Sequence, residues 1–275
     1  MKSNKTYLKS VWLIASFSVI LFAGCNDDYG VHNNNDNNSN TDYPTTADVI
    51  YNAVTDIDGN SYNAVRIGDQ IWMASNLRTT HYANGEEIPN YETPNSNVAV
   101  YGRLYSWNAA MHGEAVSATN YNEYFDSIYP RVQGVCPYGW HIPKRAEFNQ
   151  LSDYCGYHSE YLCNNSNYYI AKALASNNYW TSVSPEECYG GSCAPGVDQS
   201  TNNATGFSAI PAYNIGRNAK YWTSSLIVRA HQFDDEYWEE PDCSYFNINY
   251  NDAEGYLSQT SYPEEYTCSI RCVKD

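Results

Sequence analysis

The distribution of apolar positions divides the chain into three parts. Residues Val11–Ala23 are apolar apart from two serines, whereas the stretch that follows, to about Ala47, is rich in Asn, Asp and Ser and has no apolar periodicity. From Val49 onward, short segments of alternating apolar and polar residues are separated by loops rich in Gly, Asn, Ser and Tyr. This pattern predicts a signal segment, a flexible tether and a folded part.

The folded part begins with a predicted hairpin. Two runs of β-forming residues within Val54–Gln70 flank Asp58-Gly59-Asn60, a sequence typical of a type I′ turn. Together with Asp56, this stretch also has the spacing that opens an EF-hand calcium loop. The remaining ligand positions of such a loop, including its closing Glu, are missing. We therefore predict a turn here and not a calcium site.

Two helices are predicted further along the chain. The first covers Gly102–Met111, and its apolar face consists of Leu104, Trp107, Ala110 and Met111. The second covers Lys144–Tyr154 and follows Pro143, a residue that favours helix starts; its apolar stripe consists of Phe148, Leu151 and Tyr154. Because these helices alternate with short strand-like segments, the predicted fold class is α+β.

Composition and charge exclude one class of partner. The chain has 15 basic and 31 acidic residues and a net charge of -16. Since Lys2, Lys5 and Lys9 precede residue 25, a chain that began there would keep 12 basic residues and carry -19. A basic face for nucleic acid is not expected. The 28 tyrosines indicate a folded protein, because disordered acidic chains contain few aromatic residues.

The N-terminal segment has the pattern of a lipoprotein signal peptide, predicted over residues 1–24. Its apolar run of 13 residues is shorter than the roughly 20 residues that a spanning helix needs. Residues 21–25, Leu-Phe-Ala-Gly-Cys, resemble the bacterial lipobox, in which the cysteine carries the lipid; here that residue is Cys25. Residues 25–48 form the tether and 49–275 the domain. Asp27 and Asp28 resemble the surface-export signal of Bacteroidetes lipoproteins, which implies an outer-membrane protein facing outward. A polar linker on a periplasmic lipoprotein is the alternative.

The other eight of the nine cysteines predict a disulfide framework, because the number is even and the chain is exported. Pairs close in sequence are the simplest expectation, which gives Cys155 with Cys163 and Cys188 with Cys193. For the remaining four we predict Cys136 with Cys272 and Cys243 with Cys268. A zinc site at Cys268 and Cys272 is not supported, because no second pair of ligands has matching spacing.

The segment CPYGWHIPKRAEFNQL, which starts at Cys136, resembles the Fibrobacter succinogenes major paralogous domain family. Other parts of the family pattern occur in order: VTDIDGNSYNAVRIGDQIWMASNLRT, YGRLYSWNAA, NNATGFSAIPA, KYWTSS and CSIRCVKD. The resemblance implies a C-type-lectin-like fold, shared with formylglycine-generating enzymes. It would have small twisted antiparallel sheets, two helices and long disulfide-stapled loops that carry the binding site. The acidic loop Asp234–Cys243 looks longer than the family pattern requires.

Aromatic and acidic residues in that loop are the candidate binding site. Trp238 stands among carboxylates, an arrangement that suits sugars, because the ring stacks on the sugar face while oxygen groups bind the hydroxyls. Glu240, Asp242, Asn251 and Asp252 resemble the calcium ligands of sugar-binding C-type lectins and would make calcium the cofactor; otherwise none is expected. A solvated acidic loop is the alternative. The tryptophans inside the family motifs are expected in the core: Trp72, Trp107, Trp140, Trp180 and Trp222.

No catalytic residue is predicted. His141 is expected to be a hydrogen-bonded core residue. Cys188 and Cys193 share the spacing of the copper-binding cysteines of formylglycine-generating enzymes, but a disulfide explains them more simply. The sequence therefore predicts a membrane-anchored, non-catalytic binding or adhesion module whose ligand is a polysaccharide or glycan. The alternatives are a structural or assembly component that binds another surface protein, and an oxidoreductase related to the formylglycine-generating enzymes.

Overall fold

The computed structural model describes residues 48–113, 130–233, 236–261 and 266–275. The chain divides into two units, Met1–Tyr43 and Pro44–Asp275, and every described residue belongs to the second. The predicted signal peptide, Cys25 and nearly all of the predicted tether lie outside the described residues. None of the helices in the described part of the chain has the length and hydrophobicity required to traverse a bilayer.

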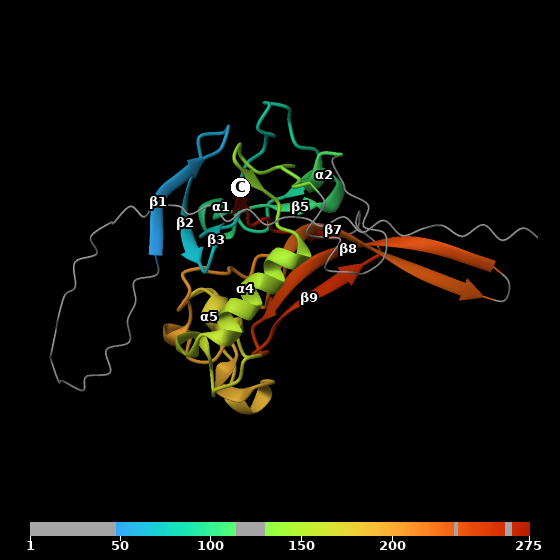
Figure 1. The fold of residues 1–275 in the computed structure, drawn as a ribbon. Helices are drawn as coiled ribbons and strands as arrows, with labels where there is room; N and C mark the ends of the chain where they lie inside the picture. The colour runs from blue at the N-terminus through green and yellow to red at the C-terminus, as the bar shows by residue number, and fades with distance from the viewer. Residues whose placement is uncertain (1–47, 114–129, 234–235, 262–265) are drawn as a thin grey trace, which may run out of the picture. The chain divides into compact units, whose positions relative to one another are not determined.

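The largest sheet has five antiparallel strands in the order β1-β2-β3-β11-β6, so the chain's last strand lies between β3 and β6. Its first three strands, β1, β2 and β3, lie side by side in Figure 1. Residues of β2 alternate between buried and exposed, which is typical of a sheet with one face in the core. The strands are β1 (Asp48–Thr55), β2 (Ser61–Ile67), β3 (Gln70–Met73), β6 (Trp140–His141) and β11 (Val273–Lys274).

The predicted hairpin is present, and its turn differs from the predicted type. The N–H of Gly59 donates to the carbonyl of Asp56, and the N–H of Asp56 donates to the carbonyl of Asn60, so the loop is longer than two residues. Gly59 has φ +81°, the left-handed conformation that a bulge residue needs. The sequence therefore located this turn correctly but not its geometry.

Two three-stranded antiparallel sheets complete the strand structure. One has the order β10-β5-β4 and the other β7-β8-β9. Strands β7 and β8 pair along nearly their whole length, whereas β9 pairs only with the Cys243–Ile248 part of β8. The two long strands therefore continue past β9 as a two-stranded ribbon (Figure 1). The strands are β4 (Tyr91–Glu92), β5 (Leu104–Ser106), β7 (Asn218–Phe233), β8 (Glu236–Asn249), β9 (Gly255–Thr260) and β10 (Thr267–Cys268).

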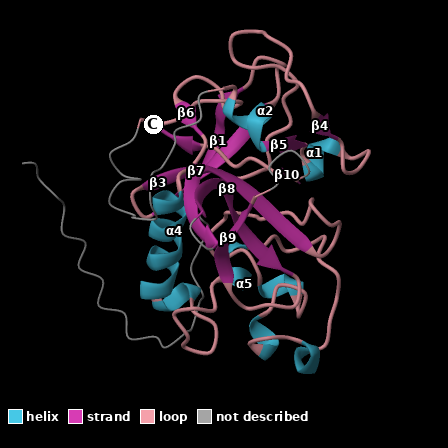
Figure 2. Ribbon diagram, turned by 90° about the vertical axis from the view of Figure 1, so that its right-hand side faces the viewer, coloured by secondary structure: helices cyan, strands magenta, loops and turns pink. Residues whose placement is uncertain are grey.

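Helix α4 (Arg145–Tyr157) confirms the predicted helix and extends it by three residues. It lies along the β7-β8-β9 sheet, with α5 near one end of β9 (Figure 2). The Glu147 carboxylate accepts a hydrogen bond from the Lys144 N–H at 2.8 Å, which satisfies a backbone donor at the helix start. The other helices are short: α1 (Val98–Tyr101), α2 (Trp107–Met111) and α5 (Ala171–Leu174), with 3-10 turns at Ser159–Tyr161, Pro185–Glu187, Gly191–Cys193 and Gln199–Thr201.

The helix predicted over Gly102–Met111 is only half helical. Leu104–Ser106 forms β5, which pairs with β4 on one side and β10 on the other. Helix α2 begins only after Ser106, whose side chain accepts a hydrogen bond from the Ala109 N–H. Sheet pairing with distant residues therefore outweighs the helical pattern here.

The core confirms the expectation for tryptophan. All five tryptophans of the family motifs are at most 4% exposed. The Trp72 ring lies 4.9 Å from the Phe148 ring and 5.6 Å from the Phe207 ring, so it joins the first sheet to α4 and to a distant loop. Such rings bury large apolar areas, and the motifs are therefore explained in part by packing.

The disulfide pattern agrees with the sequence prediction at one pair and corrects the others. Cys136 is bonded to Cys272, as predicted. Cys163 is bonded to Cys193, so the predicted pairs Cys155 with Cys163 and Cys188 with Cys193 are wrong. Closeness in sequence misleads here because Cys155 lies on the buried face of α4, packed in the core, and Cys188 turns its thiol toward the carbonyl of Ser184. Cys243 and Cys268 are free thiols in one buried cluster and do not form the predicted bond; they lie in different sheets.

Candidate functional site

A groove of about 450 Å³ lies between the C-terminal half of α4, the loop before α5, and the turn from β8 to β9. Each segment contributes side chains that are chemically suited to bind a ligand. They are Asp153 and Tyr157 from α4, Asn167 and Tyr168 from the loop, and Glu254 and Tyr256 from the turn and the start of β9. Three distant parts of the sequence thus form one surface.

Two glycines allow these segments to approach closely. A Cβ atom on Gly156 of α4 would lie 2.6 Å from the carbonyl oxygen of Asn167, and one on Gly255 would lie 2.7 Å from the Phe246 ring. Real Cβ atoms essentially never come so close, so a larger residue at either position would push the wall of the groove outward. Asp153 and Tyr157 are four residues apart and therefore lie on the same face of the helix.

The β8–β9 turn is held in place by its neighbours. The N–H of Tyr189 donates to the carbonyl of Asn251, and the N–H of Ala253 donates back to the carbonyl of Tyr189. The carbonyl of Ala253 also accepts a hydrogen bond from the N–H of Ala171 at the start of α5. The Cys163–Cys193 disulfide ties the loop before α5 to the segment that carries Tyr189. The groove is therefore built from loops that are fixed on several sides.

The tyrosines of the groove are exposed. Tyr157 is 83% exposed, Tyr168 69% and Tyr256 38%, whereas Ile170 at the floor is buried. The hydroxyl of Tyr256 accepts a hydrogen bond from the Asn249 amide at 2.9 Å, which holds this ring in place. Three exposed aromatic rings in one concave surface are unusual, and such clusters mark binding sites.

The charges in the groove are negative. Asp153 and Glu254 line it, and the described residues place no basic side chain in its lining. The Glu254 carboxylate also raises the pKa of the adjacent Tyr189 hydroxyl, chiefly through its charge. The groove therefore offers aromatic faces, hydrogen-bond acceptors and the Asn167 amide, and it is electrostatically unsuited to anions.

The residues predicted as a calcium site are not brought together. Asp242 is buried on β8, and its carboxylate accepts a hydrogen bond from the Ser261 hydroxyl at 2.7 Å. Asn251 and Asp252 lie beyond the end of β8, and the strand advances by seven residue steps from Asp242 to Asn249, so roughly 20 Å separate them from Asp242. Among the described residues, no group of three or more His, Cys, Asp or Glu side chains is placed to hold a metal ion.

The acidic segment around Trp238 is a strand and not the loop that the sequence predicted. Trp238 pairs with His231, and Glu240 pairs with Arg229, within the β7–β8 ribbon. Their side chains lie outside what the structure describes. Of the five predicted ligand-binding residues, Asp252 lies beside the groove, since its carboxylate accepts a hydrogen bond from the N–H of Glu254, a lining residue, at 3.0 Å. Asn251 precedes it in the same turn. The sequence did not single out Tyr157 or Tyr168, because in a chain with 28 tyrosines only exposure distinguishes them.

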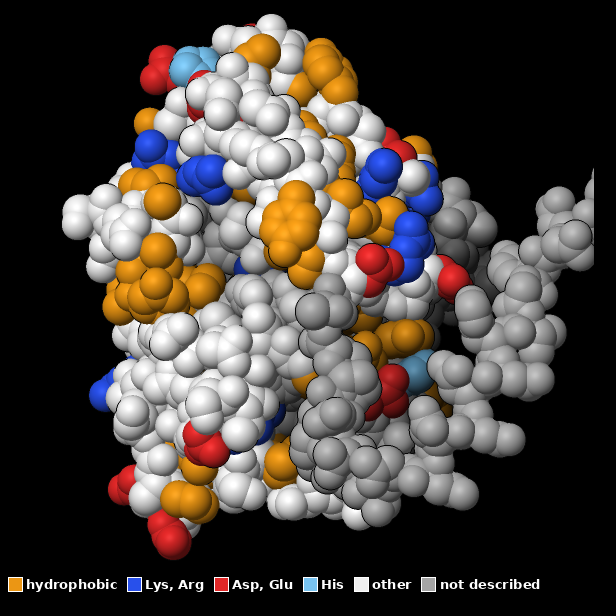
Figure 3. All heavy atoms as spheres, turned by 90° about the vertical axis from the view of Figure 1, so that its left-hand side faces the viewer, with side chains coloured by type: hydrophobic (Ala, Val, Ile, Leu, Met, Phe, Trp, Pro, Cys, Tyr) orange, Lys and Arg blue, Asp and Glu red, His pale blue; other side chains and the backbone are white. Residues whose placement is uncertain are grey.

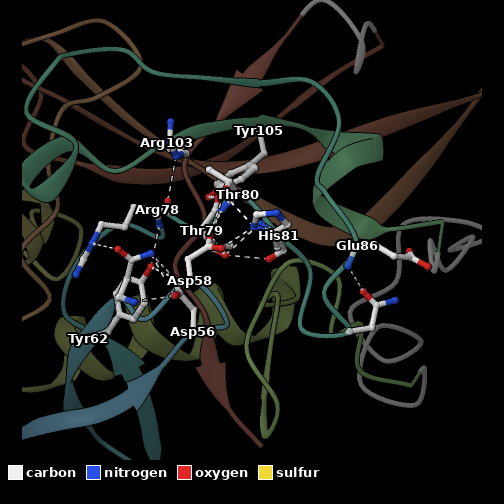
Figure 4. Close-up of polar contacts among 12 residues, drawn as sticks. Asp56, Asp58, Tyr62, Arg78, Thr79, Thr80, His81, Glu86, Arg103 and Tyr105 are labelled. Carbon is white, nitrogen blue, oxygen red and sulfur yellow. Dashed lines mark hydrogen bonds and ion pairs between the residues drawn. The ribbon is translucent and has the colours of Figure 1, made fainter.

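Other candidate residues have structural roles. Asp58 turns its carboxylate toward Thr79, Thr80 and His81, and the Thr80 N–H lies 2.5 Å from it (Figure 4). Although partial burial opposes the shift, hydrogen bonds from Thr80, His81 and Thr79 lower the pKa of Asp58 to about 2. Asp58, which lies in the turn predicted in place of a calcium loop, thus uses its carboxylate to hold the segment Thr79–His81 that follows β3. His141 is buried, with its ring nitrogens 2.8 Å from Glu147 and 2.8 Å from Asp275.

The cysteine pair compared with a copper site does not stand as two free thiols. Cys193 is held in the disulfide with Cys163, and only Cys188 of the pair keeps a free thiol. Burial and the nearby Glu187 and Glu186 raise the pKa of the Cys188 thiol, which opposes formation of a thiolate. The arrangement therefore lacks the two thiolates that such a copper site uses.

Most of the folded part of the chain matches a known protein family. The family model described as the Fibrobacter succinogenes major domain matches residues 65–274, which include the whole of the groove. No curated protein and no solved structure matches the chain. The likeness to C-type lectins therefore stays a prediction, and the α+β arrangement of small antiparallel sheets is what the structure shows.

Proposed function

The chain belongs to the Fibrobacter succinogenes major domain family, and we propose that it is a non-catalytic glycan-binding module held at the outer membrane surface by a lipid on Cys25. The observation that carries the proposal is the groove with its three exposed tyrosines. A tyrosine ring is apolar on its face and polar at its hydroxyl, so it packs against the C–H face of a sugar while other groups bind the hydroxyls.

The other groups of the groove fit the same ligand. Carboxylate oxygens of Asp153 and Glu254 accept hydrogen bonds from sugar hydroxyls, and the Asn167 amide both donates and accepts. The volume of about 450 Å³ lies within the range of roughly 300–1,000 Å³ that is typical of small-ligand sites. The two carboxylates disfavour acidic sugars, so the proposed ligand is a neutral or amino-bearing glycan.

A glycan and plant-polysaccharide array, probed with the full-length protein in a detergent without a sugar headgroup, tests this proposal. Affinity for at least one glycan that binds should fall at least tenfold in the Tyr157→Ala/Tyr168→Ala double variant. Tyr138→Ala is the matched control, because Tyr138 is 70% exposed and does not line the groove. The proposal fails if the folded protein binds no glycan, or if the double variant binds every one of these glycans as tightly as the wild type does.

The membrane anchor has its own test. Cys25→Ser removes the thiol that the lipid would modify, so the protein should leave the membrane fraction and lose incorporation of labelled fatty acid. Protease treatment of intact cells should degrade the domain if it faces outward. Degradation only after lysis would place it in the periplasm, and membrane retention of Cys25→Ser would refute the lipid anchor.

The β7–β8 ribbon supports a second candidate function, assembly with another surface protein. The part of β8 from Glu236 to Pro241 pairs with β7 but not with β9, so its second edge has no strand beside it among the described residues. An open edge of this kind accepts a strand from a partner. Co-purification of a surface protein with the wild type, but not with a variant whose ribbon is shortened at both strands, would favour this function.

A further inference from the structure

A second cavity lies away from the tyrosine groove, between the β1–β2 hairpin and the loop that follows η4 (Gln199–Thr201). Its volume is about 490 Å³, and it shares no lining residue with the groove. Hydroxyl and amide side chains provide its polar lining: Ser61, Asn63, Ser75, Asn203 and Ser208. Val49, Ala74 and Gly206 complete it, so the cavity has neither a charged nor an aromatic lining residue.

One wall of this cavity is a loop with an uncommon backbone. Asn203 has φ +70° and Ser208 has φ +54°, both in the left-handed region that residues other than glycine rarely adopt. The two side chains close the loop on itself. The side-chain NH₂ of Asn203 donates to the Ser208 hydroxyl at 2.7 Å, and the backbone N–H of Ser208 donates to the side-chain oxygen of Asn203 at 2.8 Å. Such conformations cost energy and cluster at ligand-binding sites.

A buried arginine holds this loop from beneath. The Arg271 guanidinium is fully buried and donates to the carbonyls of Phe207 and Ser208, the latter at 3.1 Å. It also donates to the Asn76 side chain at 2.7 Å, which links the loop to the chain just after β3. The cavity wall is therefore fixed before any ligand arrives, and a preorganised site binds with a smaller entropic cost.

The opposite wall presents an oriented amide. The carbonyl oxygen of the Asn63 side chain accepts a hydrogen bond from the Asn52 N–H at 3.0 Å. This contact fixes which end of the amide is engaged and leaves the NH₂ group of Asn63 available to a ligand. Asn52 is itself held in place, because its side chain accepts a hydrogen bond from the Ser61 hydroxyl at 2.9 Å.

We infer that this cavity is a second binding site, which takes a neutral sugar unit through hydroxyl–amide and hydroxyl–hydroxyl hydrogen bonds. A charged ligand would lose its hydration without meeting an opposite charge. An apolar ligand would leave the NH₂ group of Asn63 facing it without a hydrogen-bond acceptor. On the face of the molecule at the β1 side, charged side chains of both signs are scattered among uncharged groups and form no large patch of one sign (Figure 3). With the tyrosine groove, the second site would make the domain bivalent, so that one chain could bind a polysaccharide at two points.

Saturation-transfer NMR on the full-length protein, in a detergent without a sugar headgroup, tests the inference. The probes are galactose, N-acetylglucosamine, cellobiose and xylobiose, and the background is the Tyr157→Ala/Tyr168→Ala variant. At least one probe should still receive saturation. Asn63→Asp keeps the acceptor for the Asn52 N–H but removes the NH₂ donor, so it should weaken that binding at least tenfold while the Tm stays within a few degrees.

Two further variants keep the result interpretable. Ser208→Ala removes a lining hydroxyl and should also weaken binding, whereas Ser159→Ala, on an exposed turn outside the cavity, should leave it unchanged. The inference is refuted if no probe receives saturation in the groove variant, or if neither Asn63→Asp nor Ser208→Ala reduces the signal. Binding that depends on Asn63 in a protein whose groove binds nothing would support this site and refute the groove, so the two proposals fail separately.

Discussion

Replacing both Cys163 and Cys193 with alanine should lower the free energy of unfolding by about 3.6 kcal/mol. The disulfide spans 30 residues, and the chain-entropy relation for a closed loop of that length gives about 12 cal/mol/K, or about 3.6 kcal/mol at 25 °C. The Cys136–Cys272 bond spans 136 residues, for which the same relation gives about 5 kcal/mol. The second bond should therefore be the more costly of the two to remove.

The same change should act on the groove as well as on stability. The disulfide joins the loop that carries Tyr168 to the segment that holds the β8–β9 turn, and both lie against the groove. Without the bond, these loops must be ordered when the ligand binds, which raises the cost of binding. We expect a weaker affinity for glycan even at temperatures where the variant is fully folded.

Urea unfolding followed by tryptophan fluorescence measures the stability change. The midpoint should fall by more than about 1 M, and the slope should rise, because the unfolded chain without this cross-link is less compact and exposes more surface. The matched control is Cys188→Ala, whose thiol is free in this structure and whose loss should change stability little. If the Cys163→Ala/Cys193→Ala variant loses less than about 1 kcal/mol, or Cys188→Ala loses as much, the pairing described here is wrong. Non-reducing peptide mapping would then identify the true partners.

Three further results are expected. Although burial by itself would raise it, the hydrogen bond and charge of His141 lower the pKa of Glu147 from its ordinary 4.5. The ionised Glu147 carboxylate therefore contributes to the free energy of unfolding above pH 4.5, and this contribution is lost as the pH falls below that value. Urea unfolding should show that Glu147→Gln destabilises the protein at pH 7 and makes less difference near pH 3. Gly156→Ala should lower the Tm, although alanine favours helices, because its Cβ would meet the Asn167 carbonyl; a higher Tm would contradict the contact. Glycan affinity on the array should be unchanged by a chelator, because the predicted calcium ligands lie apart, and loss of binding in the chelator would contradict this.

The elements that the sequence predicted well are those whose determinants are local. The hairpin at Asp58-Gly59-Asn60 and the helix after Pro143 both have strong start or turn signals, and the structure contains both. The tryptophan prediction also holds, because large rings next to apolar and small residues are rarely left in water. The sequence did not predict the elements whose structure depends on pairing with residues far away in the chain. Residues Leu104–Ser106 have a helical pattern but pair with two strands from elsewhere in the chain.

The disulfides show the same distinction. Nearness in sequence favoured bonds within each loop, yet the bond between Cys163 and Cys193 joins two separate loops. A helix and a 3-10 turn aim the neighbouring cysteines elsewhere: Cys155 into the core and Cys188 toward a backbone carbonyl. Counting cysteines gives the number of possible bonds, and only the orientation of their side chains in the fold selects among them.

The candidate binding site illustrates why residue type alone does not locate function. The sequence predicted Trp238 as a binding residue because it is a tryptophan among acidic residues. Tyr157 and Tyr168 are two of 28 tyrosines, and their neighbours in sequence do not distinguish them from the others. The structure distinguishes these two tyrosines by exposure in a concave surface, which depends on Gly156 and Gly255 drawing three segments together. The neutral cavity has the opposite chemistry, with hydroxyls and amides in place of rings and carboxylates. Because one site depends on stacking and the other on hydrogen bonds, changes at Tyr168 and at Asn63 should alter the preference for different sugar units, and should do so independently of each other.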